Sequence, residues 1–201
     1  MGKKDERIYQ FKITLQGINP PIWRRIQAPE SYSFLDLHAA IQDAMGWEGY
    51  HLHQFEVMNP KYGEEDFIGS PDDSGLGGVK VRPGWEVPIA PYFVRTAEAI
   101  YEYDFGDSWR HKITLEKILP LESGVAYPRC IDGKRACPPE DSGGVWGYEE
   151  LLDVIKNPNH GDYEGCMEWL SDDFDPEAFN PEAVKFHDPK KELEWQKMIQ
   201  A

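Results

Sequence analysis

The segment from Tyr101 to His111 constrains the fold of this chain more than any other. Apolar and polar residues alternate on both sides of a Gly106-Asp107 turn, which is typical of a β-hairpin with one buried face. The residues expected on that face are Tyr101, Tyr103, Phe105, Trp109, His111, Ile113 and Leu115. We therefore expect an aromatic wall, with one histidine set into it, at the middle of the fold.

The residues before this hairpin predict three further strands and one helix. Alternation predicts strands over 9–15, 22–26 and 51–57, and apolar residues at helical spacing predict a helix over 34–45. Ser33 and Asp36 are spaced as a capping box, and Gly46 follows as a helix terminator. His51 and His53 are two residues apart, so both side chains should lie on the buried face of their strand.

Length and the distribution of turn residues predict one domain over residues 1–201, in two parts. Residues 1–128 form a sheet-centred part, and its segment 60–91, rich in Pro, Gly and acids, is expected to be a mobile excursion. Residues 129–201 begin with a Pro/Gly-rich loop and continue as an acidic helical subdomain. The helices are expected over 148–155, 163–170 and 190–200, with two further starts at Asp175 and Asn180.

Charge and cysteine content limit the partners and the compartment. Residues 138–201 hold 5 Lys and Arg against 16 Asp and Glu, a net charge of −11 out of −15 for the whole chain. A nucleic-acid-binding surface needs clustered positive charge, so broad nucleic-acid binding is disfavoured and a protein or peptide partner is expected. Three cysteines and the lack of a long apolar run predict a cytoplasmic protein without membrane segments.

Four segments together resemble a known family. They are residues 20–25 (PPIWRR), Gly46-Trp47 with 51–55 (HLHQF), 103–111 (YDFGDSWRH), and 137–144 (CPPEDSGG) followed by Gly147-Tyr148. In this order they resemble the uncharacterised plasmid pRiA-type ORF-three-like family, whose relatives occur on plasmids and beside insertion elements. The resemblance spans roughly Ile8 to Val184. It implies an α+β fold with a bent, roll-like antiparallel sheet, one N-terminal helix packed on it and a C-terminal helical subdomain, and it implies no activity.

The candidate site residues are the histidines of the sheet and the polar residues near them. Neutral imidazoles are common zinc ligands, so a divalent metal such as Zn²⁺ is the one cofactor considered. The candidate metal ligands are His51, His53, His111, Cys130 and Cys137. The candidate binding residues are His51, His53, Tyr103, Asp104, Asp107, Trp109, His111 and Asp141.

Two functions are compatible with these residues. One is a binding or adaptor module that uses an aromatic- and His-lined site on the sheet. The other is a metal-dependent hydrolase centred on His51, His53 and His111. The sequence shows no nucleophile motif or cofactor fingerprint, and Cys130 and Cys137 are more widely spaced than in structural zinc knuckles. We therefore favour the binding module over an enzyme.

Overall fold

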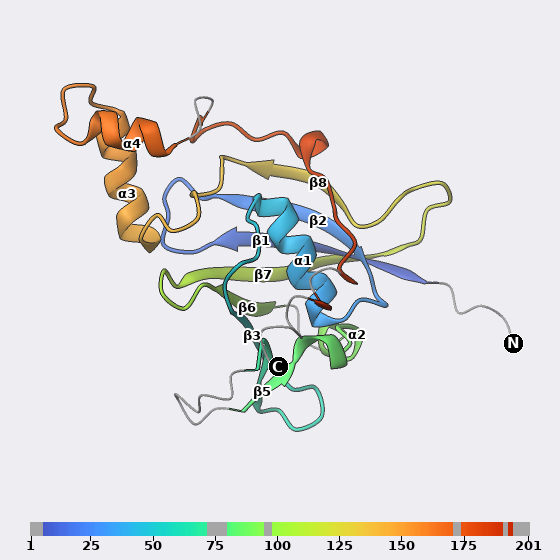
Figure 1. Cartoon of the computed structure of the whole chain (residues 1–201). Coiled ribbons are helices and arrows are strands. Elements are labelled where there is room, and N and C mark those ends of the chain that lie inside the picture. The colour runs from blue at the N-terminus through green and yellow to red at the C-terminus, as the bar shows by residue number, and fades with distance from the viewer. Residues whose placement is uncertain (1–5, 72–79, 95–97, 171–173, 191–192, 195–201) are drawn as a thin grey trace, which may run out of the picture.

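An eight-stranded sheet forms the centre of the protein, which we describe from a computed structural model (Figure 1). The structure describes residues 6–71, 80–94, 98–170, 174–190 and 193–194. The strand order is β5-β4-β3-β6-β7-β1-β2-β8. The strands are β1 (Arg7–Leu15), β2 (Trp23–Pro29), β3 (His53–Met58), β4 (Glu65–Gly69), β5 (Val81–Pro83), β6 (Glu98–Tyr103), β7 (Trp109–Pro120) and β8 (Arg129–Lys134).

The sheet, together with its helices, confirms the α+β class. All neighbouring strands are antiparallel except β4 and β5, which are parallel, so the sheet is mixed rather than purely antiparallel. Both of these strands come from the segment 60–91, which also contains a 3-10 turn, η1 (Gly84–Glu86), and the start of the short helix α2 (Ala90–Phe93). The described part of this segment therefore extends the sheet.

The β6–β7 hairpin has the expected inner face. Tyr101 pairs with His111 and Tyr103 pairs with Trp109, and all four side chains are fully buried. On the opposite face Arg110 forms an ion pair with Glu102 at 2.7 Å. Phe105 was expected inside but is 47% exposed, because β6 ends at Tyr103 and Asp104 then adopts a left-handed conformation with φ of 55°.

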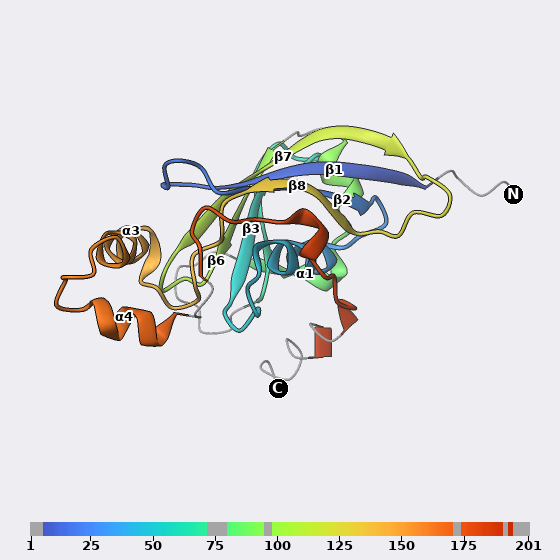
Figure 2. The ribbon, with the colours of Figure 1, turned by 90° about the horizontal axis from the view of Figure 1, so that it is seen from above.

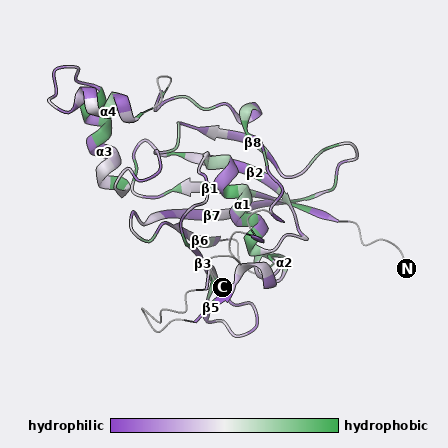
Figure 3. Cartoon of the chain, in the orientation of Figure 1, coloured by the Kyte–Doolittle hydropathy of each residue, from purple (hydrophilic) through white to green (hydrophobic). Residues whose placement is uncertain are grey.

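The helix α1 (Phe34–Met45) covers one side of the sheet and has the termini that the sequence predicts (Figure 2). The Ser33 hydroxyl accepts a hydrogen bond from the Asp36 N–H, and the Asp36 carboxylate accepts one from the Ser33 N–H. Gly46 ends the helix at φ of 96°, a conformation that favours glycine. Figure 3 shows hydrophobic and hydrophilic residues on α1, as expected for an amphipathic helix.

The helices α3 (Gly144–Ile155) and α4 (Tyr163–Trp169) lie beyond one end of the sheet (Figures 1 and 2). We call these two helices and the loop between them the α3–α4 lobe. The chain then returns past β8, where Phe179 stacks on Arg24 with the guanidinium 3.7 Å from the ring centre. None of the described helices has the length and apolar composition that a membrane crossing requires.

Two of the expected C-terminal helix starts differ from the structure. The start at Asp175 is only a turn, in which the Asp175 side chain accepts a hydrogen bond from the Glu177 N–H. The start at Asn180 leads into a single 3-10 turn, η2 (Pro181–Ala183). Prolines and short polar stretches separate these turns, so neither is long enough to become a stable helix. The helix expected over 190–200 lies mostly outside the described residues.

Candidate functional site

The aromatic and histidine side chains expected to line a site on the sheet are packed in the core instead. His53, His111, Tyr103 and Trp109 are all fully buried. The His53 ring stacks on His38 of α1, and His111 packs edge-on against Trp47 at 5.3 Å between ring centres. The sheet face is thus filled by α1 and Trp47, which leaves no accessible surface on these four residues for a ligand.

The buried histidines belong to a polar network inside this core. The Tyr101 hydroxyl lies 2.7 Å from His38 Nδ1 and accepts a hydrogen bond of 2.7 Å from the Gln42 amide. Burial lowers the pKa of His38 to about 3 and that of His111 to about 4, so both imidazoles are neutral at physiological pH. Sequence reasoning missed Gln42, whose position on the inner face of α1 was the available signal.

His51 lies apart from this network, in the loop before β3, and faces three carboxylates. Its Nε2 atom is 3.8 Å from Asp104 Oδ2, 3.9 Å from Glu140 Oε2 and 3.3 Å from Asp141 Oδ1. We call these four residues the His51 cluster. It joins three distant segments: the loop before β3, the β6–β7 hairpin and the loop before α3.

The backbone around the hairpin positions Asp104 and Asp107. The Asp104 Oδ1 atom accepts a hydrogen bond from the Gly106 N–H at 2.9 Å, which closes the turn. The Asp107 Oδ2 atom accepts one from the Gly143 N–H at 3.0 Å, so Asp107 ties the hairpin to the loop before α3. Asp107, predicted as a binding residue, therefore has a structural bond to the loop that carries Asp141.

Glu140 is the member of the His51 cluster that sequence reasoning missed. The buried Tyr103 hydroxyl donates to its carboxylate at 3.0 Å, and the Glu48 N–H donates at 2.9 Å. Burial raises the pKa of Glu140 above its usual range, because a carboxylate loses hydration there. The adjacent Asp141 was a candidate, so the acidic pair Glu140-Asp141 was the sequence signal from which Glu140 could have been predicted.

The two cysteines expected as metal ligands lie near Arg24 instead of the histidines. Burial raises the pKa of both thiols, that of Cys137 to about 12, so both are protonated. A protonated thiol is a poor metal ligand, because metals bind the thiolate form. All three cysteines are described and none forms a disulfide. Among the described residues, the metal-capable side chains with ligand atoms within 4.8 Å of one another are His51, Asp104 and Asp141. This set differs from the expected one, of which it retains only His51.

The α3–α4 lobe carries exposed tryptophans beside a cavity. Trp146 is 83% exposed and Trp169 is 50% exposed. A cavity of about 390 Å³, which we call the α3–α4 groove, has apolar walls from Leu151, Val154 and Trp169. Its acidic lining comes from Asp141, Glu150 and Asp162. Because Asp141 lines it, the groove adjoins the His51 cluster.

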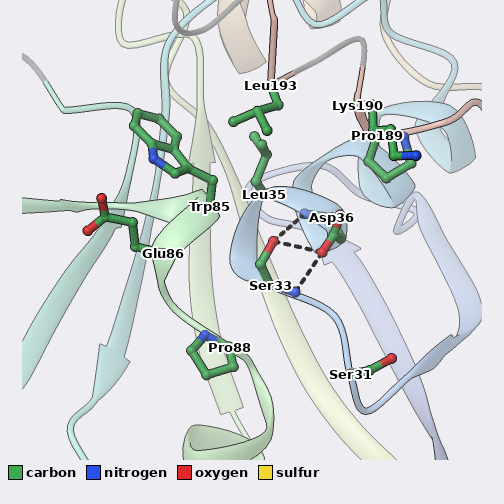
Figure 4. Close-up of a pocket in the computed structure, with 10 residues that line it drawn as sticks. All are labelled: Ser31, Ser33, Leu35, Asp36, Trp85, Glu86, Pro88, Pro189, Lys190 and Leu193. Carbon is green, nitrogen blue, oxygen red and sulfur yellow. Dashed lines mark hydrogen bonds between the residues drawn. The ribbon is translucent and has the colours of Figure 1, made fainter.

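A second cavity of about 380 Å³ lies at the start of α1 and has a different character (Figure 4). Leu35, Trp85 and Leu193 contribute its apolar side. Ser33 and Asp36 also line it, but their side chains already bond to each other and to the backbone in the helix cap. These two polar side chains therefore stabilise the N-terminus of α1, which makes this cavity a weaker candidate than the groove.

Comparisons with known proteins place the chain among proteins of the same fold. It is 32% identical over 176 residues to the uncharacterized protein y4hQ of Sinorhizobium fredii, covering 86% of each chain. It is 53% identical to a crystal structure of protein of unknown function MM3350 from Methanosarcina mazei Go1, with a TM-score of 0.83. That match covers 90% of this chain and 99% of the other. The family model described as plasmid pRiA4b ORF-3-like protein matches residues 7–183. The chain therefore belongs to the plasmid pRiA4b ORF-3-like family.

Proposed function

We propose that this protein is a cytoplasmic binding module that holds a basic peptide segment of a partner protein in the α3–α4 groove. The observation that carries the proposal is the combination of exposed tryptophan and excess negative charge on one lobe. Trp169 lines the groove and is 50% exposed, and acidic residues surround it. The position of the site differs from the expected one, since the aromatic face of the sheet is buried.

The charge of the lobe favours a basic partner. Residues 140–170 contain eight Asp and Glu and a single Lys, a net charge of −7 with histidines neutral. Such a field attracts Lys- and Arg-rich segments and repels phosphate backbones, which supports a protein partner over a nucleic acid. Association should therefore weaken as salt is added.

The apolar part of the groove suits the stems of basic side chains. The exposed Trp169 side chain, backed by the buried Leu151 and Val154, can pack against the methylene groups of Lys or Arg, while Glu150 and Asp162 meet the charged ends. The face of Trp169 offers a cation–π contact to a guanidinium. Exposed tryptophans are also the side chains that most often dominate binding energy at protein interfaces.

Two further observations support this proposal over the alternatives. The three thiols are all unpaired, which suits the reducing cytoplasm. A hydrolase centred on His51, His53 and His111 would need accessible imidazoles, but His53 and His111 are fully buried.

Peptide binding provides the test. Fluorescently labelled octapeptides that alternate Arg and Leu would be titrated with the protein in EDTA, and anisotropy would be followed at low and moderate salt. We expect saturable binding that weakens with salt, and at least tenfold weaker binding for Trp169→Ala and for Glu150→Lys. Peptides with Glu in place of Arg should not bind.

Matched control variants lie on β3 and β4, outside the residues that line the groove. Met58→Ala removes another exposed apolar side chain, 49% exposed at the end of β3, and Glu65→Lys reverses another exposed acid on β4. Both should bind the peptide like the unmodified protein. Equal weakening by these controls, or no effect of the groove variants, would remove the groove as the binding site.

A further inference from the structure

The His51 cluster has the composition and spacing of a metal site. Each of His51, Asp104 and Asp141 offers one ligand atom, and these atoms all lie within 4.8 Å of one another. Nε2 of His51 is 3.3 Å from Asp141 Oδ1 and 3.8 Å from Asp104 Oδ2. Two ligands on one tetrahedral ion, with bonds near 2.1 Å, are about 3.4 Å apart. The observed separations are therefore close to those that coordination requires.

A second observation concerns the buried carboxylate of Asp104. The residue is only 8% exposed, and its Oδ1 atom accepts the Gly106 N–H. Its Oδ2 atom lies 3.8 Å from His51 Nε2, a distance that exceeds a hydrogen bond. The Asp104 side chain is only 12% exposed, and a cation at the cluster would supply the compensating charge that a largely buried carboxylate requires.

We propose that His51, Asp104 and Asp141 bind a divalent transition metal ion, with Zn²⁺ and Mn²⁺ as the ions that suit the donors. One imidazole nitrogen with carboxylate oxygens matches these ions, whereas Mg²⁺ and Ca²⁺ prefer oxygen ligands alone. Glu140 adds a third carboxylate, held by Tyr103 and Glu48, with Oε2 at 3.9 Å from Nε2. The site opens to solvent, because the Asp141 side chain is 74% exposed.

This inference goes beyond the peptide-binding proposal and does not depend on it. The ion would join the loop before β3, the β6–β7 hairpin and the loop that leads into α3. Since Asp141 also lines the α3–α4 groove, metal binding would stiffen one wall of that groove. Peptide binding is measured in EDTA, so the failure of one proposal leaves the other standing.

The experiment uses full-length protein without a histidine tag, stripped with EDTA and dialysed. Calorimetric titration at pH 7.5 with ZnCl₂ and MnCl₂ should give one ion per chain, and CaCl₂ and MgCl₂ should bind at least tenfold more weakly. Asp141→Asn and His51→Gln should each weaken Zn²⁺ binding at least tenfold. Zn²⁺ should raise the melting temperature of the unmodified protein and slow hydrogen exchange in the β6–β7 hairpin.

The chain contains a matched control pair. His160 Nδ1 lies 3.7 Å from Asp162 Oδ2. Among the described residues, however, this pair does not belong to a group of three metal-capable side chains, as His51 does. His160→Gln should therefore leave Zn²⁺ binding unchanged. Asp141→Asn is the decisive variant, because an exposed side chain can be changed without unfolding the core.

Two results would overturn the metal site. One is the absence of stoichiometric Zn²⁺ or Mn²⁺ binding by the unmodified protein. The other is equal loss of binding in the His51 and His160 variants, which would indicate nonspecific surface binding.

Discussion

The imidazole rings of His38 and His53 stack face to face, with centroids 3.6 Å apart and planes within 5°. His38 comes from α1 and His53 from β3, so the stack joins the helix to the sheet. Two charged imidazoles at this distance would repel each other strongly. Burial lowers the pKa of His38 to about 3, so at physiological pH it enters the contact as a neutral ring.

The first prediction is a loss of stability as the pH falls. The pKa of His38 is about 3 and that of His111 about 4 in the folded protein, against about 6.5 in an unfolded chain. Between these values the unfolded state binds more protons, so stability is complete above about pH 6.5 and decreases below it. Each histidine should contribute up to about 1.4 kcal/mol per pH unit to the slope.

Urea titrations between pH 7 and pH 4.5 measure this slope. His111→Gln should reduce the slope by the contribution of one histidine. A free energy of unfolding that stays constant over this range would contradict the assignment of neutral buried imidazoles.

The second prediction concerns Trp109, which is fully buried opposite Tyr103. Trp109→Ala should lower the free energy of unfolding by about 3–5 kcal/mol, because it leaves a large cavity in the core. Trp109→Phe should cost less, since none of the described residues accepts a hydrogen bond from the indole N–H. Chemical denaturation of both variants checks this, and a loss under about 1 kcal/mol for Trp109→Ala would be incompatible with core packing.

The third prediction contrasts Arg24 and Arg25, which are adjacent on β2. Arg24 is 1% exposed and donates to the Ala44, Trp23 and Lys134 carbonyls. Arg24→Ala should cost about 3 kcal/mol or more, because three carbonyls lose a charged donor.

Arg25→Ala provides the comparison at the neighbouring position. Arg25 is partly exposed and pairs with Glu116 at 2.6 Å and Asp132 at 2.7 Å. Its replacement should cost only about 1 kcal/mol, because solvent screens such pairs. Thermal and urea unfolding of the two variants compare them directly, and similar losses would show that Arg24 is not the structural member of the pair.

The fourth prediction concerns two adjacent glycines before α3. Gly143 and Gly144 have φ of 84° and 69°, but only Gly144 lacks room, since a Cβ there would lie 2.5 Å from the Asp107 carbonyl oxygen. Gly143→Ala should cost about 1 kcal/mol from left-handed strain. Gly144→Ala should cost about 2–5 kcal/mol, because overpacking adds to the strain.

Hydrogen exchange and denaturation distinguish these two variants. In Gly144→Ala, exchange should accelerate in the β6–β7 hairpin and in α3, since the Asp107–Gly143 bond joins them. Equal effects of both substitutions would mean that the close approach of the hairpin to the loop does not contribute.

The direction of the hairpin faces and both ends of α1 follow from the sequence, because each depends on residues a few positions apart. Alternation determines which side of β6 and β7 is buried, and the capping residues of α1 bond within one turn. The pattern also predicted that His53 and His111 lie inside. It did not predict the parallel β4–β5 pair, because pairing between distant strands leaves no local signature.

The tertiary structure alone decided which side chains form the candidate sites. Periodicity says which face a residue is on, but it does not say what covers that face. Packing of α1 and Trp47 turned the expected histidine site into core, and the end of β6 at Tyr103 left Phe105 outside. His51 and Asp141 are 90 positions apart in sequence and meet at 3.3 Å only because the hairpin, the loop before β3 and the loop before α3 converge. Such contacts depend on loop paths and on packing over the whole chain, which short-range sequence patterns do not record.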